Sequence, residues 1–121
     1  MNSQQLSTDF QIICPVTDLP VGKSKRITVG ETAVALFHID DGFFAIEDAC
    51  SHQGASLAFG SIEGVSVACS RHGAVFDIRT GDVLSLPALR GVKSFLVKVE
   101  DGKLMIATTP VSDAQPALLR L

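Results

Sequence analysis

Two short segments of the sequence each bring a cysteine and a histidine together, CSH at residues 50–52 and CSRH at residues 69–72, with sixteen residues between them. Thiolates and neutral imidazoles are metal ligands, and the glycine that closely follows each pair lets backbone N–H groups turn toward anionic sulfur. A lone buried cysteine or histidine is usually a packing or satisfied residue, but four at this spacing predict a metal or cluster site. The candidate ligands are Cys50, His52, Cys69 and His72.

The identity of the metal is left open by the ligand types, because two thiolates and two imidazoles could also hold zinc in a tetrahedron. The C-x-H step is tighter than the C-x₂-C and H-x₃-H steps of zinc fingers, and no recognition helix is expected after it. The spacing therefore disfavours zinc, and a zinc-binding interaction module is kept as an alternative.

The elements that position these residues are predicted to be strands, because short runs of alternating apolar and polar residues are separated by glycine-containing turns. The expected strands lie near residues 10–14, 24–29, 32–39, 42–47, 65–69, 74–78, 82–85, 93–99 and 103–107. Helical periodicity is weak, and the tail from about 108 to 121 is expected to be loosely ordered. The pattern is typical of an all-β antiparallel sandwich or barrel.

Length and charge limit the possible functions. A chain of 121 residues with 46% hydrophobic content predicts one domain, residues 1–121. The formal net charge of -3 argues against nucleic acid as a partner. No apolar run is long enough to cross a membrane, and the start MNSQQLSTDF does not resemble a signal peptide, so a soluble cytoplasmic protein is expected. Three cysteines in a reducing compartment favour metal binding over a disulfide framework.

At the two cysteine and histidine pairs the sequence resembles the Rieske ferredoxins, whose motif of C-x-H, about sixteen residues and C-x₂-H appears here as CSHQGASLAFG and CSRHGAVFDIRTGDVLSLPA. The resemblance extends to the closing FLVKVEDGKLMIA. It implies the Rieske fold, an antiparallel base with a small subdomain at about residues 48–88 whose two loops bind one [2Fe-2S] cluster. In this family the cysteines bind the buried iron and the histidines the outer one. Residues 86–88 resemble the proline loop that covers the cluster.

Departures from the motif of respiratory Rieske proteins indicate a branch of the family. Those proteins join an extra cysteine of each segment in a disulfide, where this chain has Ala55 and Arg71. They also supply serine and tyrosine hydroxyls where Ala74 and Phe76 stand, so the resemblance implies a cluster of low potential. Ser70 replaces a proline of most ferredoxins, which concerns only the stiffness of that loop.

The function implied by the resemblance is that of an electron carrier without catalytic residues of its own. Such a carrier takes single electrons from an NAD(P)H-dependent flavin reductase and passes them to the terminal Rieske oxygenase of a bacterial aromatic-ring dioxygenase system. The chain has no room for oxygenase or reductase domains, so partners must supply both. A monomer is expected. The alternative within this fold is the small subunit of assimilatory nitrite reductase, whose typical members lack the complete ligand set.

Three further residues are weighed against ordinary roles. Cys14 lies outside both pairs and is expected to be a core or strand-end residue with no redox role. His38 alternates with apolar neighbours in a predicted strand and is expected to be a surface or satisfied histidine, not a ligand. Arg71, between two ligands, is either a solvated loop charge or a docking charge for an acidic partner.

Overall fold

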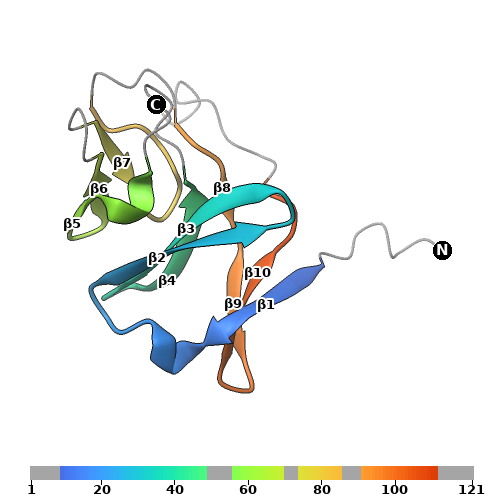
Figure 1. The fold of residues 1–121 in the computed structure, drawn as a ribbon. Coiled ribbons are helices and arrows are strands. Elements are labelled where there is room, and N and C mark those ends of the chain that lie inside the picture. The colour runs from blue at the N-terminus through green and yellow to red at the C-terminus, as the bar shows by residue number, and fades with distance from the viewer. Residues whose placement is uncertain (1–8, 49–55, 70–73, 86–90, 112–121) are drawn as a thin grey trace.

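The computed structural model describes residues 9–48, 56–69, 74–85 and 91–111. Within these residues the strands form three antiparallel sheets, with the orders β1-β10-β9, β2-β3-β4-β8 and β5-β6-β7 (Figure 1). Two single-turn 3-10 helices complete the described elements. The bounds are β1 Phe10–Pro15, η2 Val16–Asp18, β2 Lys23–Val29, β3 Thr32–Ile39, β4 Gly42–Glu47, η3 Leu57–Phe59, β5 Ser61–Glu63, β6 Ser66–Ala68, β7 Val75–Asp77, β8 Ser94–Phe95, β9 Val97–Glu100 and β10 Lys103–Ala107.

The middle sheet, β2-β3-β4-β8, has a hydrophobic core on each face because β3 is apolar at nearly every position. Successive side chains of a strand point to opposite faces, and the two sets of buried residues follow this alternation. The base core lies toward β1-β10-β9 and consists of Cys14, Leu19, Val29, Val34, Leu36, Ala45, Phe95, Leu104 and Ile106. The small-sheet core lies toward β5-β6-β7 and consists of Ala35, Phe37, Ile39, Ile46, Leu57, Ala58, Val67, Cys69, Ala74, Phe76 and Ile78.

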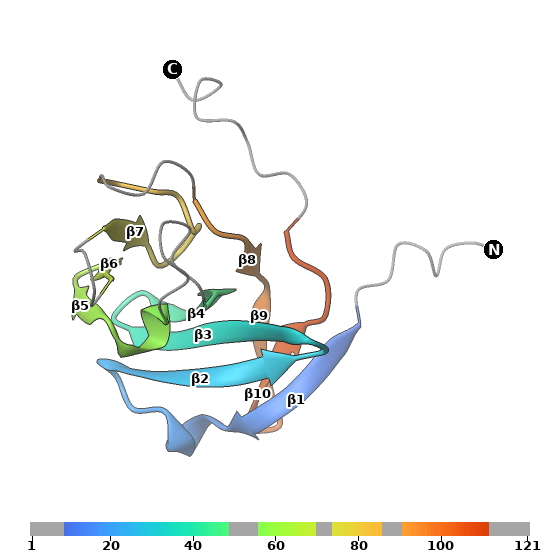
Figure 2. The same cartoon turned by 45° about the horizontal axis from the view of Figure 1, so that its top comes forward.

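The base is closed by the two ends of the described chain. Strand β1 pairs with β10 from Phe10↔Ala107 to Pro15↔Lys103. The two sheets of the base are also tied by the side chain of Gln11, whose amide donates to the carbonyl oxygen of Thr28 at 3.1 Å. Figure 2 shows β1 and β10 lying beneath β2 and β3, with β5, β6 and β7 on the opposite side of that sheet. The base therefore consists of the sheets β1-β10-β9 and β2-β3-β4-β8, the small sheet β5-β6-β7 covers the other face of the middle sheet, and β3 contributes side chains to both cores.

The chain beyond β10 continues with backbone hydrogen bonds as far as it is described. The N–H of Thr108 donates to the oxygen of Asp9 at 2.9 Å, and that of Val111 donates to Ser94 at 2.7 Å. Residues 112–121, most of the predicted loose tail, lie outside the described residues. No helix among the described residues is long and apolar enough to span a membrane.

The prediction of an antiparallel all-β fold is confirmed, and three strand predictions need correction. Strand β5 was missed, because it has only three residues and reverses at once through Gly64, whose φ is 62°. Residues 82–85 contribute only an isolated bridge, between Val83 and Phe76. The run 93–99 divides at Leu96, because β8 pairs with β4 while β9 pairs with β10. Residues 93–99 thus contribute strands to two different sheets, and the alternation of apolar residues does not show where the run divides.

Candidate metal centre

Of the four predicted ligands, the structure describes Cys69, which follows β6 directly and is 2% exposed. Cys50, His52 and His72 lie outside the described residues, as do Ala55, Ser70, Arg71 and Pro87. Among the described residues no three histidine, cysteine or acidic side chains gather as a metal site. The ends of the segments that hold the other ligands are described, and they show where those segments are anchored.

The first of these segments, 49–55, is joined at its two ends by side chains. The carboxylate of Asp48, at the end of β4, accepts hydrogen bonds from the hydroxyl of Ser56 at 2.8 and 3.0 Å. It also accepts the backbone N–H of Ala58 at 2.8 Å and pairs with Arg26 of β2, whose Nε lies 2.7 Å away. The segment that carries Cys50 and His52 therefore starts and ends at one buried carboxylate.

The second segment, 70–73, is closed by the backbone of the β6–β7 hairpin. The N–H of Cys69 donates to the carbonyl oxygen of Ala74 at 2.7 Å, and Ala68 pairs with Val75. Cys69 and Ala74, which flank the segment that carries His72, are therefore held close together. That Cys69 and His72 bind one metal centre stays a prediction from the C-x₂-H spacing.

The chain that follows the first ligand segment passes close to the end of β6, from which the second segment starts. Gly60, just beyond η3, approaches β6 so closely that a Cβ atom there would lie 2.2 Å from the backbone oxygen of Ala68. Ala68 also pairs with Ser61, the first residue of β5. The residues that follow the first segment therefore pack beside Cys69, although the two are distant in sequence.

The third segment, 86–90, contains the predicted proline loop and is anchored to the neighbouring strand. Before it, the N–H of Leu84 donates to the oxygen of Val75 at 2.7 Å, and the N–H of Val75 donates to the hydroxyl of Ser85 at 3.1 Å. After it, the N–H of Val92 donates to the oxygen of Gly81 at 2.8 Å. Gly81 and Gly91 pass so closely that neither has room for a Cβ atom.

The surroundings of Cys69 fit a metal-bound thiolate. Its neighbours in the small-sheet core are apolar and shield it from water, and cysteine thiolates are the ligands that iron–sulfur clusters use. Ala74 and Phe76, which replace hydroxyl-bearing residues of the high-potential proteins, are both fully buried here. The buried negative charge of Asp48 is already paired with Arg26, so it does not offer a free ligand.

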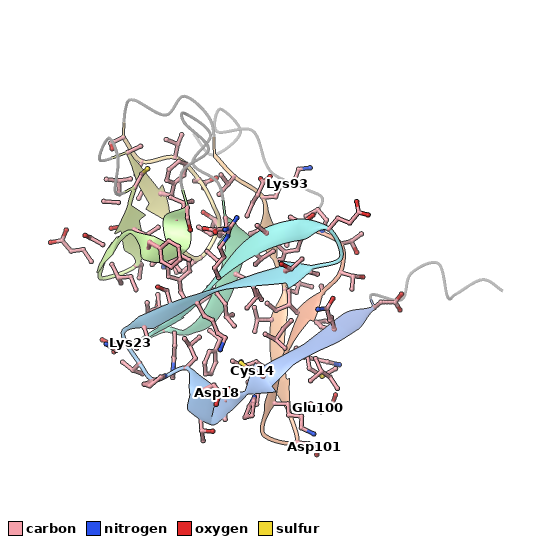
Figure 3. The ribbon with its side chains drawn as sticks, in the orientation of Figure 1. Cys14, Asp18, Lys23, Lys93, Glu100 and Asp101 are labelled. Carbon is pink, nitrogen blue, oxygen red and sulfur yellow. The ribbon has the colours of Figure 1, made fainter. Side chains whose placement is uncertain are left out.

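Cys14 and His38 have the ordinary roles predicted for them. Cys14 is 8% exposed in the base core, and burial, the main cause, raises the pKa of its thiol. Figure 3 shows it at the foot of the base, on the opposite side of the middle sheet from β5, β6 and β7. The Nδ1–H of His38 donates to the oxygen of Leu19 at 2.7 Å, and its ring stacks on Phe43 with centroids 3.9 Å apart.

The sequence analysis missed Asp48, Arg26 and Ser56 as residues that shape the site. The available signal was the acidic residue two positions before Cys50, at the end of an otherwise apolar strand. Arg26 gave no signal, because its partner is more than twenty residues away in sequence and is brought close only by the pairing of both β2 and β4 with β3.

Comparisons with known proteins agree with this geometry. Residues 9–96 match the family described as the Rieske [2Fe-2S] domain. The 3-phenylpropionate/cinnamic acid dioxygenase ferredoxin subunit of Photorhabdus laumondii subsp. laumondii is 40% identical over 98 residues, 80% of this chain and 92% of the relative.

Solved structures give the same result for the fold. The complex of reduced oxygenase and oxidized ferredoxin in carbazole 1,9a-dioxygenase contains a chain that superposes with a TM-score of 0.80 at 30% identity, covering 87% of this chain and 98% of that one. The ferredoxin of carbazole 1,9a-dioxygenase from Nocardioides aromaticivorans IC177 has a TM-score of 0.78 at 27% identity, covering 84% and 98%.

Proposed function

The chain belongs to the family of Rieske [2Fe-2S] domains, and on this premise we propose that it carries single electrons from an NAD(P)H-dependent flavin reductase to the terminal oxygenase of an aromatic-ring dioxygenase system. Rieske domains bind one [2Fe-2S] cluster, which takes up and gives back one electron. The relatives are named as ferredoxin subunits, so the chain is an electron-transfer component and not an enzyme.

The observation that carries the proposal is the 40% identity to a dioxygenase ferredoxin subunit that is matched over 92% of its length. A ferredoxin of another dioxygenase forms a complex with its oxygenase, which supports an oxygenase as the acceptor for this chain. The reductase is inferred from the need for an electron donor. A monomer in the cytoplasm, where thiols stay reduced, completes the proposal.

We assign Cys50 and Cys69 as the thiolate ligands of one iron, and His52 and His72 as the imidazole ligands of the other. The burial of Cys69 and the close approach of Gly60 to Ala68 support this assignment, because they bring the chain that follows the first ligand segment next to the residue that precedes Cys69. Segment 86–90, which follows the contacts of Leu84 and Ser85 with Val75 of β7, would limit the access of water. The potential should lie near the bottom of the Rieske range, about −150 mV, because Ala74 and Phe76 provide no hydroxyl donors.

The test begins with the purified chain, which should be red-brown and contain two irons and two acid-labile sulfides, as a Rieske cluster requires. Cys69→Ser should abolish the cluster, whereas Cys14→Ser, a matched thiol loss in the base core, should leave iron content and visible spectrum unchanged. Voltammetry of the parent then checks the potential. A colourless protein with one zinc, or a parental spectrum in Cys69→Ser, would overturn the ligand assignment.

The carrier role is tested by adding the loaded chain to a flavin reductase, NADH and a terminal Rieske oxygenase from a dioxygenase system. The expected result is that product formation depends on the loaded chain and is absent with Cys69→Ser. Arg71→Glu should slow turnover most at low salt if Arg71 contacts an acidic partner, because exposed charges act mainly on the association rate. Permanent co-purification with nitrite reductase would favour the alternative instead.

A further inference from the structure

Among the described residues, Asp48 is the charged residue that is buried, and its side chain is fully inaccessible to solvent. A buried carboxylate is unfavourable unless ion pairs and hydrogen bonds compensate the lost hydration. Asp48 has both, since its oxygens receive Ser56, Ala58 and Arg26. The arrangement joins three separate parts of the chain, namely β4, β2 and the residues around η3.

Two side chains of strand β2 bind Asp48 and Ala58, which lie on either side of the first ligand segment. Arg26 and Ser24 are two positions apart, so they lie on the same face of the strand. Arg26 pairs with Asp48, while the hydroxyl of Ser24 donates to the carbonyl oxygen of Ala58 at 2.6 Å. Both backbone polar groups of Ala58 are thus bound, one to Asp48 and one to β2.

The consequence for the first ligand segment is geometric. Asp48 precedes residues 49–55 and Ser56 follows them, and a hydrogen bond of 2.8 Å joins these two flanking residues. A loop whose ends are fixed has fewer conformations than one with a free end, and its ligands are more closely placed. The chain supplies this constraint through side chains, because no strand pairing joins residues 48 and 56.

We propose that Asp48 is a positioning residue of the cluster, which holds the segment of Cys50 and His52 in binding geometry by joining its two ends to β2. This inference rests on the proposed assignment of Cys50 and His52 as ligands. Residues that support metal ligands from behind commonly change metal affinity or activity by about 10- to 100-fold when replaced.

A control exists in the small sheet. The carboxylate of Asp77 accepts the backbone N–H of Arg79 at 2.8 Å and the guanidinium at 3.1 Å, but it serves the turn at residues 78–82 and does not join the ends of a ligand segment. Asp77→Asn therefore weakens a comparable set of contacts without releasing the first ligand segment. Leu36→Ala in the base core gives a second control, which should lower the stability and leave the contacts of Asp48 intact.

The experiment measures two quantities on cluster-loaded protein, the melting temperature and the rate of iron release to a chelator. Asp48→Ala should release iron about 10- to 100-fold faster than the parent. Asp48→Asn keeps one acceptor oxygen and should show a smaller increase, and Ser56→Ala the smallest. The electron paramagnetic resonance signal of the reduced cluster should broaden in the same order, because the ligand geometry becomes less uniform.

The controls Asp77→Asn and Leu36→Ala show how much faster iron is released when the melting temperature alone is lowered. If the Asp48 variants release iron faster than this relation predicts, Asp48 is a positioning residue. If the Asp48 variants follow the same relation between release and melting temperature as these controls, with parental line widths, Asp48 is only a structural residue. Should Asp48→Ala not fold, Asp48→Asn and Ser56→Ala decide on the same criteria. Cys50→Ser tests the ligand assignment separately, because retention of the cluster there refutes the assignment however Asp48 variants behave.

Discussion

The base and the small sheet both pack against side chains of β3, but each is stabilised internally by different contacts. Strands β2 and β3 pair along their whole length, from Lys23↔His38 to Val29↔Thr32, whereas β5, β6 and β7 pair over three positions each. The small sheet adds close backbone approaches at three glycines and carboxylate contacts at Asp48 and Asp77. Regular alternation is thus sufficient for the base, while the small sheet depends on particular residues at particular places.

The largest test of this difference uses neighbouring residues of β3 that point to opposite cores. Phe37→Ala leaves a cavity in the small-sheet core, and Leu36→Ala leaves one in the base core. We expect a loss of about 3–5 kcal/mol for Phe37→Ala and about 2–5 kcal/mol for Leu36→Ala, measured by chemical denaturation.

The two variants should differ more in the rate of iron release than in the free energy of unfolding. Phe37 packs in the same core as Cys69, so Phe37→Ala should accelerate iron release, while Leu36→Ala should leave it close to the parental rate. Equal acceleration in both variants would mean that the two layers do not act separately.

A second test compares two glycines with similar backbone angles. Gly81 has φ 85° and a Cβ atom there would lie 2.1 Å from the oxygen of Val92, whereas Gly102 has φ 74° and open space around it. Gly102→Ala should cost about 1 kcal/mol, from backbone strain alone. Gly81→Ala should cost clearly more, about 3 kcal/mol, because Val92 must also move.

Thermal denaturation of both glycine variants checks this prediction. Similar losses would show that the crossing of Gly81 and Gly91 adjusts easily, and the small sheet would then be less dependent on close approach than the structure indicates. Hydrogen exchange at Val92, which donates to Gly81, gives a local measure of the same effect.

The smallest expected effect concerns the pH dependence of the base. Burial raises the pKa of the Cys14 thiol above its usual 9.0, partly offset by the positive charge of Lys25. The folded state therefore holds the thiol proton more tightly, and this contribution to stability is present below the thiol pKa of the unfolded chain and is lost as the pH rises through the folded value.

Alkylation by iodoacetamide, located by mass spectrometry, measures this shift. In the folded protein the reaction at Cys14 should reach half of its maximal rate at a higher pH than in urea, because burial raises the pKa of the thiol. Lys25→Gln should move the folded profile to still higher pH, because it removes the one charge that lowers this pKa. Identical profiles in folded and unfolded protein would contradict the burial effect.

The sequence predicts the base well because its strands are long enough for alternation to show and because glycines mark their turns. It predicts the small sheet less well, since Ser61–Glu63 is too short for a pattern and Val83 forms only a bridge. The ligand candidates follow from residue type and spacing, which need no tertiary structure. The contact of Arg26 with Asp48 could not be predicted, because it depends on how β2 and β4 lie on either side of β3.

The pairing of β1 with β10 has a consequence for how the protein is made. Phe10 finds its partner only when Ala107 has been synthesised, so nearly the whole chain has left the ribosome before the base can close. Strands β2 to β7 and their ligand segments are complete earlier, with one face of β3 still lacking its cover. Contacts so distant in sequence form slowly. A chain halted before β10 would therefore expose Val34 and Leu36 to water.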